Sequence, residues 1–376
     1  MEWYHMGNRR LGKMCSLNLY ELRKEKGITQ SELAEMLGVS FQTISKWENG
    51  VTIPDVKNVI AMAEFFDATT DQILGLQPIK YSYYSRKTAS SEYWNEKLDY
   101  IRSSRENLWN RDYMEFLIQK VWNIRHAVNI IDFGCGNGYL AGLMLPFLPK
   151  GSTYTGIDIS DVLIRDAKST YLTAKNSVRF QCENIYKYKS DQKYDIVICQ
   201  TFLRELPDPK MALKKMVSFL KPNGMIACIE VNRELENAGF YIEGLNYANI
   251  LDTEIQRKYW VTEYENMDRD YAIGMRIPFY LREFGLKDIA VRMQDKVIFA
   301  DPSKEEEYGK FRESYLASKG DERRLVDIYV NHGLTKSEAE KNAKTRKKIR
   351  EKIVNEGKAF LKSTGLLITY GYKKDV

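Results

Sequence analysis

Three glycines at alternate positions follow a predicted strand, in the run DFGCGNG at residues 132–138. Glycine lets the backbone turn tightly and approach a ligand closely, because it carries no Cβ atom. Asp158 ends the next predicted strand, where a carboxylate commonly accepts hydrogen bonds from ribose hydroxyls. These residues predict a site for a nucleotide-like cofactor, which could be a dinucleotide or another adenosine derivative.

Short apolar strands alternate with helical runs around this turn. The five strands predicted over residues 129–230 are NIIDFG, YTGIDI, VRFQC, YDIVICQ and MIACIEV. Residues 284–300 add a further helix and strand, and LLITYGYK near the end adds a seventh strand that we expect to be antiparallel. The alternation predicts an α/β doubly wound sheet covered on both faces, with ligands bound beyond the carboxyl ends of its strands.

This block resembles the class I S-adenosylmethionine-dependent methyltransferases of the small-molecule type, over roughly residues 90–300 and the last strand. The resemblance rests on IIDFGCGNGYL, QCEN, VICQTFLRELPDP and LKPNGMIACIE. It implies a seven-stranded Rossmann-like fold and S-adenosylmethionine as the cofactor, with NAD as the disfavoured alternative. The cofactor-binding residues that it implies are Asp132, Gly134, Cys135, Gly136, Asn137, Gly138, Asp158, Ile159, Glu183, Asn184, Gln200 and Tyr113.

The resemblance assigns roles within this set. Asp158 would bind the ribose, Glu183 would meet the adenine amino group, and the Asn184 backbone would face the adenine ring. Gln200 would line the methionine end of the site. Tyr113 belongs to the run LWNRDYMEFLIQKVW, where related enzymes place a helix over the cofactor, and it would reach the methionine carboxylate. Simple packing of this helix on the sheet is the alternative.

The methyl acceptor is expected to be a small molecule rather than a DNA base. Amino-methylating DNA enzymes carry an Asn/Asp-Pro-Pro-aromatic motif after the fourth strand, where this chain reads QTFL at residues 200–203, and the Pro-Cys motif of cytosine-C5 enzymes is absent. Insertions at about 233–275 and 303–363 leave the carboxyl edge of the sheet and predict a helical lid, with an ordinary helical core as the alternative. Residues expected near the substrate are Arg204, Glu205, Glu230 and Asn232, none of which the sequence identifies as a catalytic base.

Residues 17–75 predict five short helices around a common apolar core. Thr29 and Glu32 form a capping box at the start of the second helix, and Ser40 caps the third. Two short helices joined by a turn at Gly38 are typical of a helix-turn-helix, whose second helix enters the major groove of DNA. The region therefore predicts an all-α DNA-binding domain.

The stretch ITQSELAEMLGVSFQTISKWENG resembles the Cro/repressor-type (XRE) helix-turn-helix family, and the resemblance covers nearly all of residues 17–75. Three of the residues it assigns to DNA would bind phosphates (Gln30, Thr43, Asn49), and three would face base edges (Phe41, Gln42, Lys46). The complete set of DNA-binding residues that it implies is Gln30, Ser40, Phe41, Gln42, Thr43, Lys46 and Asn49. Residues 1–75 carry eight Lys and Arg against ten Asp and Glu, a net charge of −2, which leaves a module for protein contacts as the alternative.

The composition of the chain limits the classes of protein to which it can belong. The chain has 376 residues, 44% of them hydrophobic and 29% charged, which suits a globular protein and excludes wholesale disorder. No apolar run reaches the length of a membrane helix, and the N-terminus lacks the apolar core of a secretory signal, so we expect a cytoplasmic protein without a membrane partner. Five cysteines without a C-x-x-C pair and three histidines argue against a metal site.

Two functions stay open on these grounds. The predicted domains are a helix-turn-helix at residues 1–75, a linker at 76–90 and a methyltransferase domain at 91–376. The first function is an S-adenosylmethionine-dependent methyltransferase that acts on a small molecule and is joined to a sequence-specific reader of double-stranded DNA, which would bind as a homodimer. The second is a transcriptional regulator whose methyltransferase-like domain senses S-adenosylmethionine or a metabolite without turnover.

Overall fold

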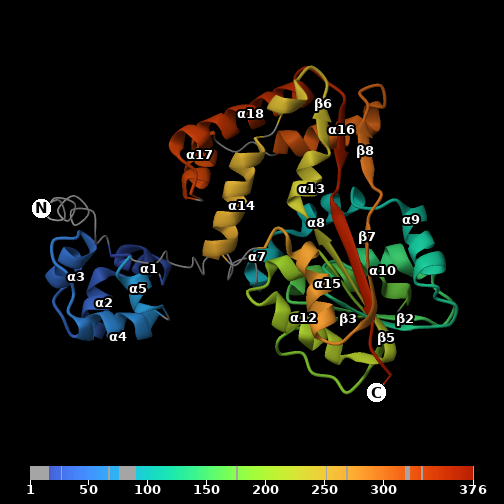
Figure 1. Ribbon diagram of the computed structural model, residues 1–376, viewed down its shortest axis with the longest axis horizontal. Coiled ribbons are helices and arrows are strands. Elements are labelled where there is room, and N and C mark those ends of the chain that lie inside the picture. Colours follow the sequence, from blue (N-terminus) through green and yellow to red (C-terminus); the bar gives the residue numbers. More distant parts are fainter. Residues whose placement is uncertain are drawn as a thin grey trace, which may run out of the picture. The chain divides into compact units, whose positions relative to one another are not determined.

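The computed structural model describes the chain from residue 17 to residue 375 with short gaps (Figure 1). The described ranges are 17–26, 28–66, 68–75, 90–174, 177–250, 252–267, 270–317, 322–331 and 333–375. The chain divides into two compact units, residues 1–84 and residues 85–376. The predicted linker at 76–90 lies outside the described residues except for Ser90.

Five short helices form the described part of the first unit, as the sequence predicts. They are α1 (Leu19–Glu25), α2 (Gln30–Leu37), α3 (Phe41–Glu48), α4 (Val56–Phe66) and α5 (Thr70–Ile73). Thr29 and Glu32 each accept a hydrogen bond from the other's backbone N–H, which confirms the capping box. Gly38 ends α2 with a φ of 65°, in the left-handed region. The apolar sides of the helices meet in one core that includes Leu33, Ile44 and Met62.

A buried carboxylate on α3 joins three helices of this unit. Glu48 accepts hydrogen bonds from Arg23 Nε at 2.5 Å, from Arg23 Nη2 at 2.9 Å and from the Gln30 side-chain amide at 2.6 Å. Arg23 belongs to α1 and Gln30 begins α2. The Arg23 and Glu48 side chains are 6% and 3% exposed, and the hydrogen bond to Glu48 raises the pKa of Arg23. Removing one partner would leave an uncompensated buried charge, which typically costs ~3–5 kcal/mol.

The second unit is built on a seven-stranded sheet, as predicted. Its strands are β1 (Asn129–Phe133), β2 (Thr153–Asp158), β3 (Val178–Cys182), β4 (Tyr194–Gln200), β5 (Leu220–Val231), β7 (Lys287–Met293) and β10 (Leu366–Tyr372). The strand order is β3-β2-β1-β4-β5-β10-β7. The first five strands run parallel, and β10 pairs antiparallel with both β5 and β7. From β1 the chain adds β2 and β3 on one side of the sheet and then β4 and β5 on the other. This change of direction between β1 and β4 defines the doubly wound topology, in which ligands bind at the carboxyl ends of these strands.

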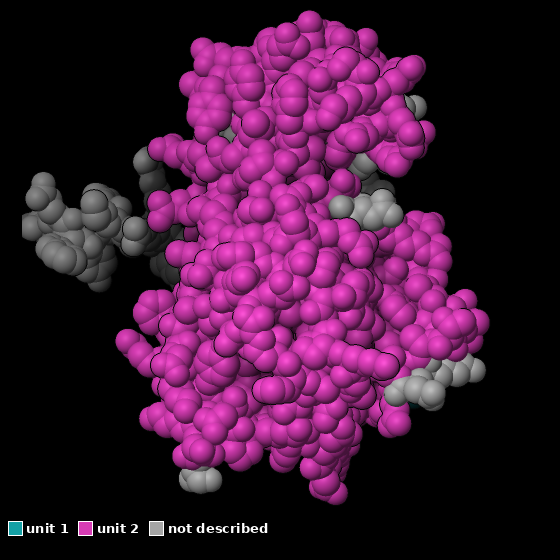
Figure 2. Space-filling model, turned by 90° about the vertical axis from the view of Figure 1, so that its right-hand side faces the viewer, with its two compact units in different colours: residues 1–84 teal, residues 85–376 magenta. Residues whose placement is uncertain are grey.

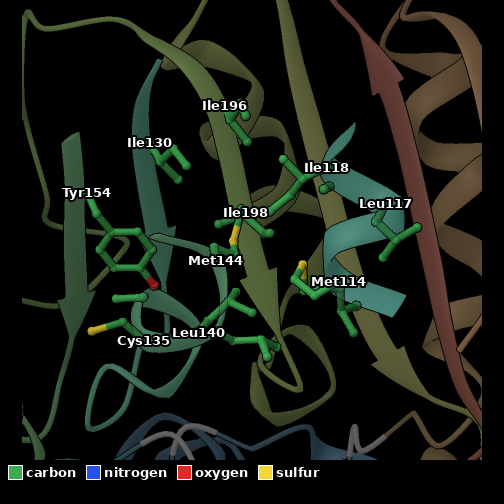
Figure 3. Packing of buried hydrophobic residues seen from close by; sticks show 14 of the residues in the cluster. Met114, Leu117, Ile118, Ile130, Cys135, Leu140, Met144, Tyr154, Ile196 and Ile198 are labelled. Carbon is green, nitrogen blue, oxygen red and sulfur yellow. The ribbon is translucent and has the colours of Figure 1, made fainter. Parts of the chain in front are cut away.

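Alternate residues of the central strands face opposite sides of the sheet, and both sides are buried. Ile130 and Ile198 share one apolar cluster with Leu140 (Figure 3), while Ile131 and Val197 belong to a second cluster. The helices and helical turns around the sheet are α7 (Ser91–Asn95), α8 (Leu98–Glu106), α9 (Arg111–Phe116), η2 (Leu117–Val121), α10 (Tyr139–Met144), η3 (Leu145–Phe147), α11 (Asp161–Thr170), η4 (Leu172–Ala174), η5 (Leu203–Glu205), α12 (Pro209–Ser218) and α15 (Ile273–Glu283). None of the described helices has the length and apolarity that crossing a membrane requires.

The two insertions fold together into a lobe beside the sheet (Figure 1) and belong to the same compact unit as the sheet (Figure 2). Its elements are α13 (Arg233–Ala238), β6 (Phe240–Ile242), η6 (Tyr247–Asn249), α14 (Thr253–Met267), β8 (Val297–Ala300), α16 (Glu305–Ala317), α17 (Glu322–Asn331), α18 (Lys336–Val354) and β9 (Phe360–Ser363). The predicted helical insertions contain helices and also two short strands that the sequence did not predict, β6 and β9, which form a three-stranded antiparallel sheet with β8. Residues 284–300 likewise give two strands, β7 and β8, in two different sheets. Strands of three or four residues are too short to show a period-2 pattern, and their partners lie far away in the sequence.

The central strands predict the response to a core substitution. Ile198 on β4 is fully buried, so Ile198→Ala should lower the free energy of unfolding by ~2–5 kcal/mol. Met211 on α12 is 52% exposed, and Met211→Ala should change it by less than ~0.5 kcal/mol. Urea unfolding followed by circular dichroism measures both. Similar losses in the two variants would contradict the assignment of Ile198 to the core.

Candidate functional site

The turn after β1 passes through three glycines in the left-handed region. Gly134, Gly136 and Gly138 have φ values of 74°, 55° and 79°. A Cβ atom on Gly134 would lie 2.3 Å from Phe202 Cδ2, and one on Gly138 would lie 2.7 Å from Phe180 Cζ. Backbone conformation and close packing therefore both require glycine at these two positions.

Asp158 at the end of β2 holds this turn in place. Its two carboxylate oxygens accept hydrogen bonds from the Gly136 N–H at 2.8 Å and from the Ser160 N–H at 2.9 Å. The Gly134 N–H donates to the Ile157 carbonyl at 2.8 Å, so the adjacent strand ends are joined twice. Burial raises the pKa of Asp158, while the backbone N–H groups favour its charged form. Each carboxylate oxygen has two lone pairs, so Asp158 can also accept hydrogen bonds from a ligand.

A pocket of about 220 Å³ lies at the carboxyl ends of these strands. Asp158 and Ile159 line it after β2, and Glu183 and Asn184 line it after β3. Helices α7 and α8 contribute further walls, with Trp94 on α7 and Ile101 and Arg105 on α8. The pocket therefore combines apolar walls with carboxylates and one arginine.

A smaller cavity of about 20 Å³ adjoins the pocket at the glycine turn. Arg105, Gly134 and Gly136 line both spaces. Gln200 lines the smaller cavity, and its side-chain oxygen accepts a hydrogen bond from the Trp109 indole N–H at 2.8 Å. This bond fixes the orientation of the Gln200 amide.

Asp132 also lines the smaller cavity. The Tyr154 hydroxyl donates to one of its carboxyl oxygens, and the other oxygen is buried without a hydrogen-bond partner among the described residues. Burial raises the pKa of Asp132 to about 8. The hydrogen bond from Tyr154 and the positive charge of Arg105 oppose this shift, because both favour the charged form of Asp132.

Most of the predicted cofactor residues meet at these two spaces. The larger pocket is lined by Asp158, Ile159, Glu183 and Asn184, the smaller cavity by Asp132, Cys135, Asn137 and Gln200, and both by Gly134 and Gly136. Gly138 and Tyr113 line neither of them. Gly138 instead allows Phe180 to pack closely where α10 begins.

Tyr113 lies outside the two cavities because α9 packs on the sheet. Its hydroxyl donates to the Met293 carbonyl at 3.0 Å, and its ring stacks on Trp109 and Phe116. The helix that lines the pocket here is α8, through Ile101 and Arg105. An arginine on a largely polar helix carries no pattern in the sequence that distinguishes a pocket residue from an exposed one.

Charged groups surround Arg105. Burial lowers the pKa of Arg105 and the positive charge of Arg204 lowers it further, while the negative charges of Glu230 and Glu205 raise it. Two arginines and two glutamates from α8, η5 and β5 therefore interact at the pocket, where Arg105 and Glu205 line the wall. A group of balanced charge is required here, because an isolated buried ion costs several kcal/mol.

Of the four residues expected near the substrate, Glu205 is the one that lines a described cavity. Its carboxylate pairs with Arg204 Nε at 2.8 Å, and both side chains are buried. The Arg204 guanidinium lies 5.9 Å from the ring centroid of Tyr271, which follows α14 in the first insertion. Through Tyr271 the first insertion approaches η5, but none of the described residues of the two insertions lines the pocket, so a lid over it stays a prediction.

Helix α3 presents the predicted base-contacting residues to solvent. Phe41 is 47% exposed, and Gln42 and Lys46 are also exposed. On the opposite side of the helix, Ile44 and Trp47 are buried in the core of the first unit. The amphipathic spacing of α3 therefore aims three chemically different side chains outward.

The predicted phosphate contacts also have roles within the unit. Ser40 caps α3 by accepting a hydrogen bond from the Thr43 N–H at 3.1 Å, and the Asn49 amide donates to the Ser45 carbonyl at 2.8 Å. The Gln30 amide donates to Glu48, so a phosphate would have to displace that bond or use the backbone N–H groups at the start of α2. Among the described residues, no three His, Cys, Asp or Glu side chains are close enough to hold a metal ion.

Comparison with known proteins assigns both regions. A helix-turn-helix family model matches residues 19–73, and a methyltransferase domain model matches residues 124–268. The ubiquinone biosynthesis O-methyltransferase of Coxiella burnetii (strain Dugway 5J108-111) is 30% identical over 121 residues, which cover 32% of this chain and 50% of that protein. The protein of the same name from Nitrosospira multiformis is 29% identical over 130 residues, 33% of this chain and 53% of that protein. The chain spans about half the length of these curated relatives.

Solved structures with a related arrangement are distant in sequence. The plantazolicin methyltransferase BpumL in complex with S-adenosylhomocysteine is 17% identical with a TM-score of 0.42, covering 78% of this chain and 96% of that one. The [4+2]-cyclase SpnF is 18% identical with a TM-score of 0.38, covering 71% and 81%. The family matches fall on α1 to α5 and on the segment from before β1 to the end of α14. The chain joins a helix-turn-helix domain to a methyltransferase domain with a seven-stranded Rossmann-like sheet.

Proposed function

We propose that the second unit transfers a methyl group from S-adenosylmethionine to a small-molecule acceptor. The observation that carries this proposal is the pair of adjoining cavities, where Asp158 and Glu183 meet Arg105 at the strand ends. S-adenosylmethionine presents ribose hydroxyls, an adenine amino group and a carboxylate. The residues present therefore fit these three parts of the cofactor.

The chain's own residues divide the binding between them. Asp158 accepts hydrogen bonds from the ribose hydroxyls, and Glu183 with the Asn184 backbone binds the adenine edge. Arg105 binds the methionine carboxylate, since an arginine presents two parallel N–H donors to a carboxylate. Gln200, fixed by Trp109, lines the same end. The cofactor supplies an electrophilic methyl group on a sulfonium when it is bound.

The protein contributes alignment and exclusion of water to a direct displacement. Glu205 lines the pocket, and its carboxylate pairs with Arg204 Nε at 2.8 Å. A carboxylate oxygen of Glu205 accepts a hydrogen bond from a hydroxyl or an amine of the acceptor and orients the nucleophile. The curated relatives are named as O-methyltransferases, which favours a hydroxyl.

The first unit, in our proposal, binds double-stranded DNA. The match to a helix-turn-helix model and the exposed Phe41, Gln42 and Lys46 on α3 support it. The missing DNA-methyltransferase motif after β4 favours a regulatory role for the bound DNA over a role as methyl acceptor. A sensor without turnover is the second candidate, and the coupling experiment below distinguishes it.

Gly134→Ala should weaken the binding of S-adenosylmethionine at least tenfold, because the new Cβ would displace Phe202 from the pocket wall. Gly285→Ala is the matched control. Gly285 has a φ of 79° with nothing within 4 Å of an added Cβ, so it incurs the same backbone strain of ~1–2 kcal/mol away from the pocket. Isothermal titration calorimetry on both folded variants measures the affinities. Equal affinities would contradict the assigned pocket.

Turnover and coupling separate the enzyme from the sensor. We expect methylated product from a metabolite extract, detected by mass spectrometry, and its loss in Asp158→Ala, which removes the ribose acceptor. Operator DNA should change the affinity for S-adenosylmethionine less than about tenfold, or ~1.4 kcal/mol. A larger effect of DNA together with no methylated product from any extract would favour the sensor.

The first unit should bind a palindromic duplex as a dimer, with half-sites separated by one helical turn of ~10 base pairs. Gln42→Ala and Lys46→Ala should relax sequence preference, because each removes a base contact worth ~1–3 kcal/mol. Gln30→Ala should weaken all sequences alike, and Met36→Ala, an exposed change on α2, serves as the control. Selection from random DNA at low salt reports the preferences. Failure of the wild type to enrich any sequence would favour a protein-contact module.

A further inference from the structure

Glu230 has contacts that the methyl-transfer proposal does not use. It lies near the end of β5 and is fully buried. Its Oε1 accepts hydrogen bonds from the Phe202 N–H at 2.8 Å and the Leu203 N–H at 2.7 Å. Its Oε2 is buried without a hydrogen-bond partner among the described residues. One carboxylate oxygen therefore satisfies two consecutive backbone donors in the segment that follows β4.

The segment that Glu230 contacts is strained. Thr201 has a φ of 47°, which is unfavourable for a β-branched residue, and it is buried. Its N–H donates to the Ile229 carbonyl at 2.7 Å. Such a conformation persists only where surrounding contacts over-determine it. Glu230, the residue after Ile229, accepts two further hydrogen bonds from the residues that follow Thr201. Together these bonds constrain the backbone of the turn.

The strained segment is also a wall of the pocket. Thr201, Phe202, Glu205 and Leu206 line the larger cavity. The Phe202 ring lies against Gly134, where a Cβ atom would come within 2.3 Å of it. A change in the backbone at Phe202 and Leu203 would therefore move this wall against the glycine turn and shift Glu205.

We propose that Glu230 is a positioning residue that holds the Thr201–Leu203 turn, and with it the wall of the cofactor pocket, through its two backbone hydrogen bonds. The inference rests on the proposed cofactor site. Neighbouring charges suit the role, since Arg204 favours the charged form of Glu230 while Glu205 opposes it. Burial raises the pKa of Glu230 to about 7, so the carboxylate is mostly charged at pH 8.

The test compares three variants at pH 8. Glu230→Met keeps the length of the side chain and removes the acceptor, whereas Glu230→Gln retains a neutral acceptor oxygen. Asp195→Asn is the control, because Asp195 accepts hydrogen bonds from the Asn129 N–H at 2.8 Å and from Lys221 Nζ at 2.9 Å at the amino ends of β1 and β4, away from the pocket. Calorimetry measures the dissociation constant for S-adenosylhomocysteine, and hydrogen exchange followed by mass spectrometry reports on the peptide that contains Phe202 and Leu203.

We expect Glu230→Met to weaken S-adenosylhomocysteine binding at least tenfold and to speed exchange in that peptide. Glu230→Gln should give intermediate values for both properties, because its neutral oxygen accepts hydrogen bonds more weakly than a carboxylate, and Asp195→Asn should match the wild type in both. Wild-type binding and exchange in a folded Glu230→Met would overturn the proposal. If Glu230→Met does not fold, Glu230→Gln decides: a partly raised dissociation constant with partly faster exchange supports the role, and wild-type values in both overturn it. A wild-type protein that binds no S-adenosylhomocysteine would instead refute the cofactor site, while the exchange data would still test the turn.

Discussion

The hydrogen bonds from the Gly136 and Ser160 N–H groups to the Asp158 carboxylate determine the shape of the site. The Gly136 bond ties the turn between β1 and α10 to the end of β2, the neighbouring parallel strand, and so keeps this turn close to the sheet. A turn this tight needs left-handed residues, which explains the glycines. Because Gly134 has no side chain, Phe202 can pack directly on it and form the next wall of the pocket.

Four charged side chains at the pocket also hold separate elements of the second unit together. Arg105, Arg204, Glu205 and Glu230 come from α8, η5 and β5, and the charges of Arg204 and Glu205 shift the pKa values of Arg105 and Glu230. Two positive and two negative groups balance, so burial does not leave an uncompensated ion. The same balance joins the helix that covers the pocket to the strands that form its base. In the first unit, Glu48 plays a comparable part by joining α1, α2 and α3 through Arg23 and Gln30.

Local patterns in the sequence predicted a large part of both units. The five helices at 17–75 have caps and apolar spacing that act within a few residues, and the capping box at Thr29 and Glu32 is confirmed. The seven strands of the main sheet are predicted because strands buried on both faces read as continuous apolar runs. The carboxyl ends of parallel strands meet at one edge of the sheet, so the sequence predicts that residues at the ends of β1, β2, β3 and β4 lie close together. Ten of the twelve predicted cofactor-binding residues line the two cavities.

Contacts between distant segments decided the rest. The small sheet of β6, β8 and β9 pairs strands of three or four residues, as in Phe240 with Lys362, and such short runs carry no periodic signal. Arg105 lines the pocket and Tyr113 does not, because the packing of α8 and α9 sets which helix reaches the strand ends. Sequence alone determined which residues could do chemistry. The tertiary structure determined which of them share a cavity, because direction and distance between separate elements depend on how whole faces pack.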